Sequence, residues 1–244
     1  MNDTSRSGLR DLTAAVRRSP HRGEAWFRLA HFLHYQTDHQ RFSARAYERA
    51  QALAPDRDLR AHLGSALVYA NQVERGIALI EDAIADDPQP SHYRRLAVCL
   101  LRDGQVALAE QVCRSALAVD PASAHGRFLL GEALRDASPE EAVASYRDAI
   151  RTSPDFAAAW QSLGRSLIET DQIDSGIAAL RRAAECDPYD PYTQAYLGNG
   201  LWRSKAMDAA ARHYRHAVRL ARRDSDLRRI CLQFFETTGI DVSE

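Results

Sequence analysis

Lysine is almost absent from this chain of 244 residues: Lys205 is the only one, and arginine makes up the rest of the 32 basic side chains. This bias is typical of a GC-rich coding genome and indicates no function. The formal net charge at neutral pH is only −1, so the chain as a whole has no field that would attract it to nucleic acid or to an acidic membrane. Binding driven by net charge alone is therefore not expected.

Cysteine and long apolar runs are also scarce. The four cysteines (Cys99, Cys113, Cys186 and Cys231) are not spaced as metal or redox pairs, so we expect small buried side chains. No run approaches the roughly 18 apolar residues that a membrane-spanning helix needs, and the N-terminal segment MNDTSRSGLRDL lacks the apolar core of a signal peptide. The composition predicts a soluble, cytoplasmic protein that does not enter a membrane.

Signatures of catalysis are missing as well. The sequence contains no nucleophile elbow, phosphate-binding glycine loop or dinucleotide fingerprint. His31 and His34, with His39 nearby, and His213 and His216 place imidazoles one helical turn apart, but a third metal ligand is not evident. We expect these histidines to lie on solvated helix faces, and we expect no catalytic residue, metal or cofactor.

Proline is present at regular intervals. Six of the nine prolines recur every 33 to 35 residues, namely Pro20, Pro55, Pro88, Pro121, Pro154 and Pro188. A fixed period of this length indicates stacked structural units. With the prolines aligned, each unit has a leucine in the same register, and the residue that follows it is always small: Ala30, Gly64, Ala97, Gly131, Gly164 and Gly198.

Each unit is predicted to be a helix–turn–helix. Small or apolar residues fall at i, i+3, i+4 and i+7 in both halves, and proline ends the second helix. The segment Ser138-Pro139-Glu140-Glu141 predicts a helix start, with Ser138 in a capping box. In the stretch AAAWQSLGRSL, Gly164 is predicted to let two helices approach, and Trp160 to pack between adjacent units.

These residues resemble the tetratricopeptide repeat family. The family pattern Trp-x-x-Leu-Gly-x-x-Tyr, then Ala-x-x-x-Phe-x-x-Ala, then Pro, is matched best by residues 157–188. The resemblance implies an all-α fold, a right-handed superhelical solenoid that spans residues 1–244 as a single domain, in which neighbouring units supply the core that one helix pair lacks. The six predicted units are residues 23–55, 57–88, 90–121, 124–154, 157–188 and 191–222.

Both ends of the chain fit the same register. Residues 8–20 are predicted to form the second helix of a partial unit, and residues 225–236 a capping helix with Leu227, Ile230, Cys231 and Phe234 on one face. We interpret the apolar CLQFF segment of this helix as a seal on the end of the solenoid. The alternative is a contact between two copies of the chain, which would make the protein a homo-oligomer.

The family geometry implies that six positions of each first helix face a concave groove. Aromatic and arginine side chains, which are enriched at interface hot spots, are common at these positions, and arginine binds carboxylates through paired hydrogen bonds. The resemblance therefore implies a groove for a peptide that carries acidic and apolar groups; the alternative is a solvated face, with the partner elsewhere. The predicted groove residues are Phe27, His31, Tyr35, His62, Tyr69, Arg94, Arg95, Arg102, Phe128, Gln161, Arg165, Tyr192, Tyr196, Asn199, Trp202 and Arg203, with Arg28 and His34 at further concave positions.

A basic stripe is predicted on the convex side of the last unit. It consists of Arg212, Arg215, Arg219 and Arg222, and it is continued by Arg228 and Arg229. A solvated face is the preferred interpretation, and docking to an acidic protein is the alternative. Nucleic-acid binding is expected less, because no aromatic side chains interleave with these arginines.

The predicted function is protein–protein interaction without catalysis, as an adaptor, scaffold or co-chaperone-like module. The alternative is an accessory subunit, or a substrate-recruiting region, of an enzyme complex. Two specific uses of the family are disfavoured. A clamp for chaperone tails needs lysine and asparagine where this chain has Phe27, His31 and His62, and a sugar-transferase asparagine ladder needs asparagine where it has Arg28, His62 and Arg95.

Overall fold

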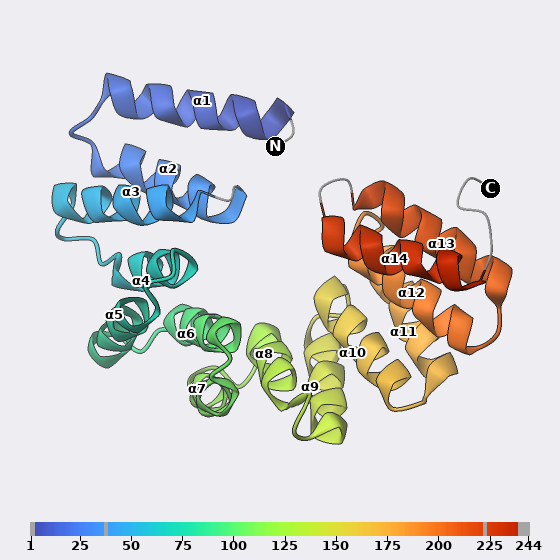
Figure 1. Cartoon of the computed structure of the whole chain (residues 1–244). Helices are drawn as coiled ribbons and strands as arrows, with labels where there is room; N and C mark the ends of the chain where they lie inside the picture. Colours follow the sequence, from blue (N-terminus) through green and yellow to red (C-terminus); the bar gives the residue numbers. More distant parts are fainter. Residues whose placement is uncertain (1–2, 37–38, 222–223, 239–244) are drawn as a thin grey trace. The chain divides into compact units, whose positions relative to one another are not determined.

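The computed structural model describes residues 3–36, 39–221 and 224–238, and all the regular structure in these ranges is α-helical (Figure 1). The helices are α1 (Asp3–Arg18), α2 (Gly23–Gln36), α3 (Gln40–Leu53), α4 (Arg60–Tyr69), α5 (Val73–Asp86), α6 (Pro90–Asp103), α7 (Val106–Val119), α8 (Ala124–Leu134), α9 (Pro139–Thr152), α10 (Ala157–Glu169), α11 (Ile173–Cys186), α12 (Pro191–Arg203), α13 (Met207–Leu220) and α14 (Ser225–Thr238). No helix in the described part of the chain is long and apolar enough to cross a membrane. The cytoplasmic location stays a prediction.

The chain divides into two compact units, Met1–Pro121 (unit 1) and Ala122–Glu244 (unit 2). In unit 1, α1 packs on α2, and the hairpins α2/α3, α4/α5 and α6/α7 follow in order, each joined to the next by contact of a second helix with the following first helix. Unit 2 repeats this scheme with α8/α9, α10/α11 and α12/α13, and α14 packs on α13. Each unit is therefore a stack of helical repeats; the single solenoid over residues 1–244 stays a prediction.

Among the described residues, four of the turns between the two helices of a repeat share one local conformation. Asn71, Gly104, Asp171 and Lys205 occupy equivalent positions after a first helix, and all have positive φ, between 65° and 80°. The next residue then donates its N–H to a carbonyl five residues back, as Gln72 does to Leu67 (2.9 Å). This is the Schellman C-cap, which satisfies the last carbonyls of the helix and reverses the chain. The single lysine of the chain thus lies at a left-handed turn position.

Glycine allows the two helices of a hairpin to touch through their backbones. A Cβ on Gly64 would lie 2.4 Å from the carbonyl oxygen of Gly76, and a Cβ on Gly76 would lie 2.5 Å from that of Gly64. Gly164 and Gly176 are paired in the same way, at 2.9 and 2.8 Å. The helical glycine in AAAWQSLGRSL is therefore a packing position, as its register predicts.

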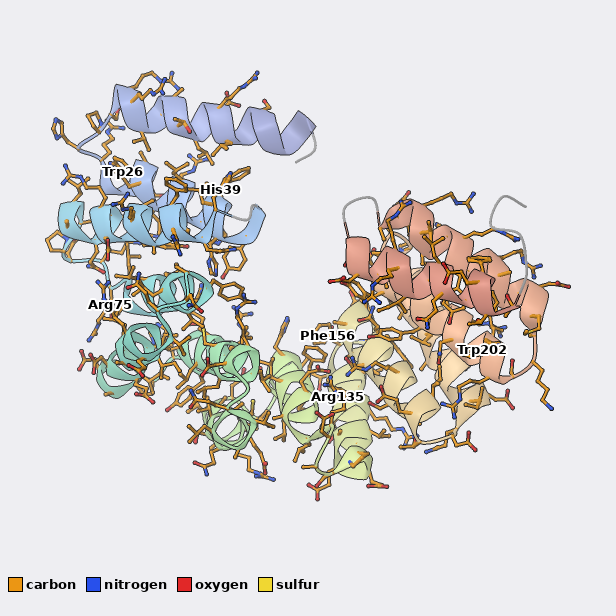
Figure 2. The ribbon with its side chains drawn as sticks, viewed as in Figure 1. Trp26, His39, Arg75, Arg135, Phe156 and Trp202 are labelled. Carbon is orange, nitrogen blue, oxygen red and sulfur yellow. The ribbon has the colours of Figure 1, made fainter. Side chains whose placement is uncertain are left out.

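Tryptophan joins the start of a repeat to the proline before it. The indole Nε1 of Trp26 donates to the carbonyl of Pro20 (2.9 Å), and that of Trp160 donates to the carbonyl of Pro154 (2.8 Å). Trp160 also packs against a buried cluster that includes Tyr146. Trp26 is labelled beside α2 in Figure 2. Both tryptophan rings are half-buried, and their contacts stabilise the repeat fold.

Two local predictions need correction. Ser138 precedes α9 and Pro139 is its first residue, but the Ser138 side chain accepts no cap hydrogen bond, so the capping box does not form. In α14, Cys231, Phe234 and Phe235 are buried against the last repeat, which fits an end seal. Ile230, expected on the same face, is instead 55% exposed.

Candidate functional site

What we call the first-helix face of unit 1 consists of side chains from three first helices: Phe27, Arg28, His31, His34 and Tyr35 of α2, His62 and Tyr69 of α4, and Arg94, Arg95 and Arg102 of α6. On it, aromatic and histidine rings follow one another in contact. Phe27 and His31 have centroids 6.0 Å apart, His31 and Tyr35 4.6 Å, Tyr35 and His34 4.5 Å, and His34 and Tyr69 5.0 Å. We call this set the ring ladder. His62 extends it sideways, 5.5 Å from Phe27. Helical spacing brings the rings of α2 together, and the stacking of the next repeat adds those of α4.

Arginines flank the ring ladder. The Arg102 guanidinium lies over the Tyr69 ring at 4.3 Å, and Arg95 donates to the Tyr35 hydroxyl at 2.8 Å. Arg28 of α2 is exposed and lines a hollow beside the ladder, and Arg94 is exposed on α6. Within the described residues, none of these four arginines forms an ion pair with a carboxylate. The face therefore offers cations beside apolar rings, and the predicted residues of unit 1 are brought together.

Burial keeps the histidines of the ladder uncharged at neutral pH. Desolvation, followed by the nearby Arg95 charge, lowers the pKa of His34 to about 4 and that of His62 to about 3. The same two causes lower the pKa of His31. The positive charge of this face therefore resides on the arginines.

His34 contradicts the expectation of a solvated histidine. It is only 7% exposed, and its Nε2 lies 3.3 Å from the Ser65 hydroxyl of the next repeat. His213 is likewise half-buried, with its Nδ1 2.9 Å from Gln194 Oε1. His34 lies where the next repeat covers α2, and His213 contacts the other helix of its own repeat. Periodicity within one helix reveals neither contact.

We expect acid to destabilise the fold partly through His34. Its folded pKa of about 4 lies below the unfolded value of 6.5, so the unfolded chain takes up the proton first as the pH falls below 6.5. Protonation of His34 in the unfolded chain should therefore lower the free energy of unfolding by about 2 kcal/mol between pH 7 and pH 5. Urea unfolding at pH 7 and pH 5 should show that the free energy of unfolding of the His34→Gln variant declines by about 2 kcal/mol less than that of the wild type. Equal declines in the two proteins would contradict the assignment.

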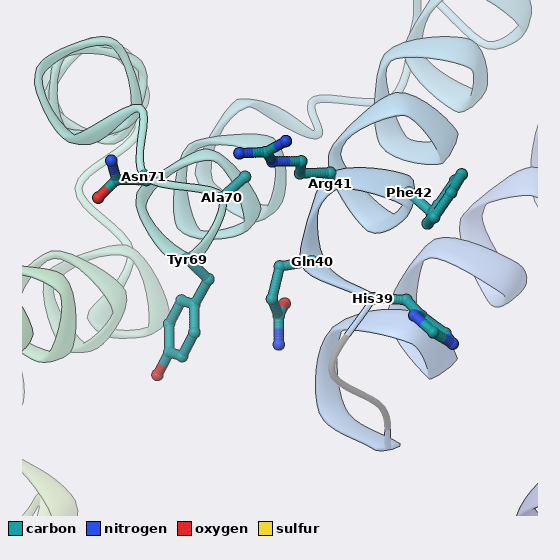
Figure 3. A pocket seen from close by; sticks show the side chains of 7 residues that line it. All are labelled: His39, Gln40, Arg41, Phe42, Tyr69, Ala70 and Asn71. Carbon is teal, nitrogen blue, oxygen red and sulfur yellow. The ribbon is translucent and has the colours of Figure 1, made fainter.

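Two hollows adjoin the ladder. One, of about 440 Å³, is lined by Leu12 of α1, by Phe27, Arg28, His31, Phe32 and Tyr35 of α2, and by His62 of α4. The other, of about 310 Å³, lies between the start of α3 and the end of α4 and includes Tyr69 and the 60% exposed Phe42 (Figure 3). The first hollow gives the ladder a recess of a size that holds side chains.

Several predicted groove residues of unit 2 are engaged in the fold. Gln161 donates to Asp190 and to the Thr193 hydroxyl (2.8 Å), which ties α10 to the start of α12. Arg203 donates to the Ile168 carbonyl and pairs with Asp171 at 2.9 Å. Phe128 packs on Phe156 and Tyr146. The functional groups of these three residues are therefore already used within the fold.

Four others line a separate hollow of about 310 Å³ in unit 2: Arg165, Tyr192, Tyr196 and Asn199. Leu227 and Ile230 of α14 complete its wall, and the sequence pattern assigned both only to an end seal. Trp202 is 43% exposed beside Phe234 (Figure 2). The hollow thus combines first-helix residues with the capping helix.

Comparison with known proteins identifies the fold family. The sequence model of the tetratricopeptide repeat matches residues 62–124 and 132–191, about half of the chain. The chain belongs to the tetratricopeptide repeat family. The repeat fold predicted from the sequence is thereby confirmed. Tetratricopeptide repeats are protein-interaction modules, so the family supports a role in protein–protein interaction, while the absence of catalysis stays a prediction.

Solved structures show the same fold at low sequence identity. The thermophilic repeat protein TTC0263 of Thermus thermophilus is 24% identical, with a TM-score of 0.62 over 72% of this chain and 97% of its own. MamA of Desulfovibrio magneticus RS-1 is 19% identical, with a TM-score of 0.58 over 69% of this chain and 96% of its own. The Cut9–Hcn1 hetero-tetramer of the APC/C gives 14% identity and a TM-score of 0.73 over 94% of this chain and 46% of its own. Curated protein sequences give no significant match.

The basic stripe of this tetratricopeptide repeat protein is only partly exposed. Arg212 and Arg219 lie at the surface, but Arg215 is half-buried over the Phe235 ring of α14, at 5.6 Å. Arg228 donates to the Val218 carbonyl at 3.3 Å, and Arg229 faces Asp226 at 4.0 Å. Arg222 lies outside the described residues. The capping helix therefore covers part of the surface on which the stripe was predicted.

The cysteines of this tetratricopeptide repeat protein are packing residues. Cys99, Cys113 and Cys231 are buried, and Cys186 is half-buried. Burial raises the pKa of Cys99 and Cys231 to about 11 and that of Cys113 to about 12, so these thiols are protonated at neutral pH. In the described ranges, no three histidine, cysteine or acidic side chains are grouped so as to hold a metal ion.

Proposed function

We propose that this tetratricopeptide repeat protein binds an extended segment of another protein on the first-helix face of unit 1. The segment carries acidic side chains and aromatic or aliphatic ones. The observation that carries the proposal is the ring ladder from Phe27 to Tyr69 with Arg95 and Arg102 on it. The role is that of an adaptor or scaffold.

The chemistry of the face selects this partner. Arg28 and Arg94 are exposed and unpaired within the described residues, so they can take carboxylates without first breaking an internal ion pair. The rings and the recess of about 440 Å³ offer apolar area next to those charges, and buried aromatic and arginine contacts dominate binding energy in many interfaces. A carboxylate beside an apolar side chain satisfies both features.

Selection from a displayed library of random twelve-residue peptides tests the proposal. The immobilised full chain should enrich peptides that contain both acidic and aromatic or aliphatic residues, and binding should weaken as salt rises. Enrichment without acidic residues would contradict the proposal. So would tighter binding of a fluorescent single-stranded oligonucleotide than of the selected peptides, because bases also stack on rings between arginines.

A further inference from the structure

Basic side chains gather on the second helices of unit 2, outside both the first-helix face of unit 1 and the hollow of unit 2. Helices α11 and α13 each pack against α12 (Figure 1). Helix α11 carries Arg181 and Arg182, and α13 carries Arg212, His216 and Arg219. Spacings of four and three residues place the last three on one face of α13. The four arginines are exposed and His216 is half-buried, so the two helices present a basic surface.

His213 shows that positive groups of both helices lie close together. Its Nδ1 is 2.9 Å from Gln194 Oε1 of α12, and because an amide oxygen only accepts, Nδ1 donates this bond and fixes the ring. Desolvation lowers the pKa of His213, and the charges of His216, Arg212 and Arg181 lower it further. Arg181 of α11 therefore lies near Arg212 and His216 of α13. We call these three residues the basic cluster.

The basic cluster is not neutralised by acidic side chains. Arg182, beside it on α11, pairs with Glu185. In contrast, no side chain of the cluster forms an ion pair with another residue in the described part of the chain. Asp208 precedes Arg212 by one helical turn on α13, but the two are not paired. The cluster is thus able to bind an external anion without first losing an internal partner.

The chemistry of the cluster favours a phosphate monoester. Guanidinium groups bind phosphate through paired hydrogen bonds, and a monoester offers three terminal oxygens and a charge of about −1.5 to −2 at neutral pH. Three basic side chains from two helices match those three oxygens. Nucleic acid is less suited, because its bases stack on aromatic rings. Helix α11 has no phenylalanine, tyrosine or tryptophan, and α13 has only Tyr214, which is 5% exposed.

We infer that the basic cluster binds a phosphorylated serine or threonine of a partner protein. Arg181 contacts the phosphate from α11, and Arg212 and His216 contact it from α13, so the phosphate bridges two consecutive repeats. Free small ligands are usually held in clefts, whereas this cluster lies on an open helical surface that suits a phosphate presented on a chain. The site does not depend on the first-helix face, because all its residues belong to unit 2.

The test uses the full chain and the peptide acetyl-Gly-Gly-phosphoserine-Gly-Gly-amide, whose glycines offer no side chain to the ring ladder. Titration followed by amide and imidazole chemical shifts should give a dissociation constant about tenfold lower than for the matched glutamate peptide. The shifts should fall on α11 and α13. The pKa of His213 should rise in the complex, because the phosphate offsets the positive charges beside it. Equal affinities, or shifts confined to unit 1, would overturn the inference.

Two further ligands separate the sources of phosphate. Inorganic phosphate at the same ionic strength should bind about threefold more weakly than the phosphoserine peptide, because the peptide backbone adds contacts along α13. Inorganic phosphate that binds as tightly would overturn the assignment to a protein-borne phosphate. A thymidine pentanucleotide that binds more tightly than the peptide and shifts the same resonances would overturn it in favour of nucleic acid.

Substitutions in the cluster locate the contact. Arg181→Gln and Arg212→Gln should each weaken binding of the phosphoserine peptide about fivefold, and both side chains are exposed, so the fold should tolerate the changes. The matched control is Arg182→Gln, which removes the same charge from the neighbouring position of α11 and should weaken binding less than about twofold. Equal losses in the control and the cluster variants would show a response to net charge and overturn the inference.

Discussion

Gly64→Ala should lower the free energy of unfolding by about 2–3 kcal/mol, although alanine is the better helix former by about 1 kcal/mol. The added Cβ would lie 2.4 Å from the Gly76 carbonyl oxygen and 2.7 Å from Ile80 Cγ1. The carbonyl belongs to the backbone of α5, so α4 and α5 would have to separate along their line of contact. Urea unfolding followed by circular dichroism measures the loss.

Gly104→Ala provides the matched control. Its Cβ would have nothing within 4 Å, but the residue has φ of +80°, so the expected loss is about 1 kcal/mol from backbone strain alone. A Gly64→Ala protein as stable as the wild type would show that the backbone contact between α4 and α5 does not limit the packing. The account of the glycine register would then be wrong.

Reversing two arginines of unit 1 should weaken partner binding about 100-fold. Arg94→Glu with Arg102→Glu removes two charge-assisted contacts, each worth roughly 1.5 kcal/mol, and adds repulsion of acidic side chains. Neither side chain forms an ion pair within the described residues, so the main contact that the fold loses is the stacking of Arg102 on Tyr69, which is worth about 0.5–1 kcal/mol at an exposed site. The affinity of a library-selected peptide, measured by fluorescence anisotropy, reports the effect.

The control variant is Arg45→Glu with Arg49→Glu, which makes the same change of charge on α3, the second helix of the first repeat. Arg45 and Arg49 are exposed on α3 and form no ion pair in the described part of the chain, and reversing both alters net charge as much as the first variant does. We expect less than about threefold weakening, from long-range electrostatics alone. Similar losses in the two variants would show that binding responds to net charge and not to the first-helix face.

The register of prolines, leucines and small residues was enough to predict the repeats. Each predicted range holds one helix pair, and the glycine pair Gly164–Gly176 lies where two helices touch. These features follow from spacing within about 34 residues, which the sequence displays directly. The aromatic and arginine composition of the unit 1 face was also predictable from register.

What the sequence could not predict depends on contacts between repeats. Gln161 and Arg203 fall at groove positions by register, but their partners Asp190 and Asp171 lie 29 and 32 residues away. His34 is buried by the following repeat, not by its own helix. Likewise, Leu227 and Ile230 of α14 line a hollow together with residues of α12, although the apolar pattern assigned both only to an end seal.

The most direct test of the central claim is the location of a bound peptide. A library-selected acidic peptide that carries a photo-reactive phenylalanine should be cross-linked to the full chain, and the modified residues identified by mass spectrometry. The account predicts cross-links on α2, α4 and α6, close to the ladder residues Phe27, Tyr35 and Tyr69. Cross-links confined to the second helices α3, α5 and α7 would contradict it.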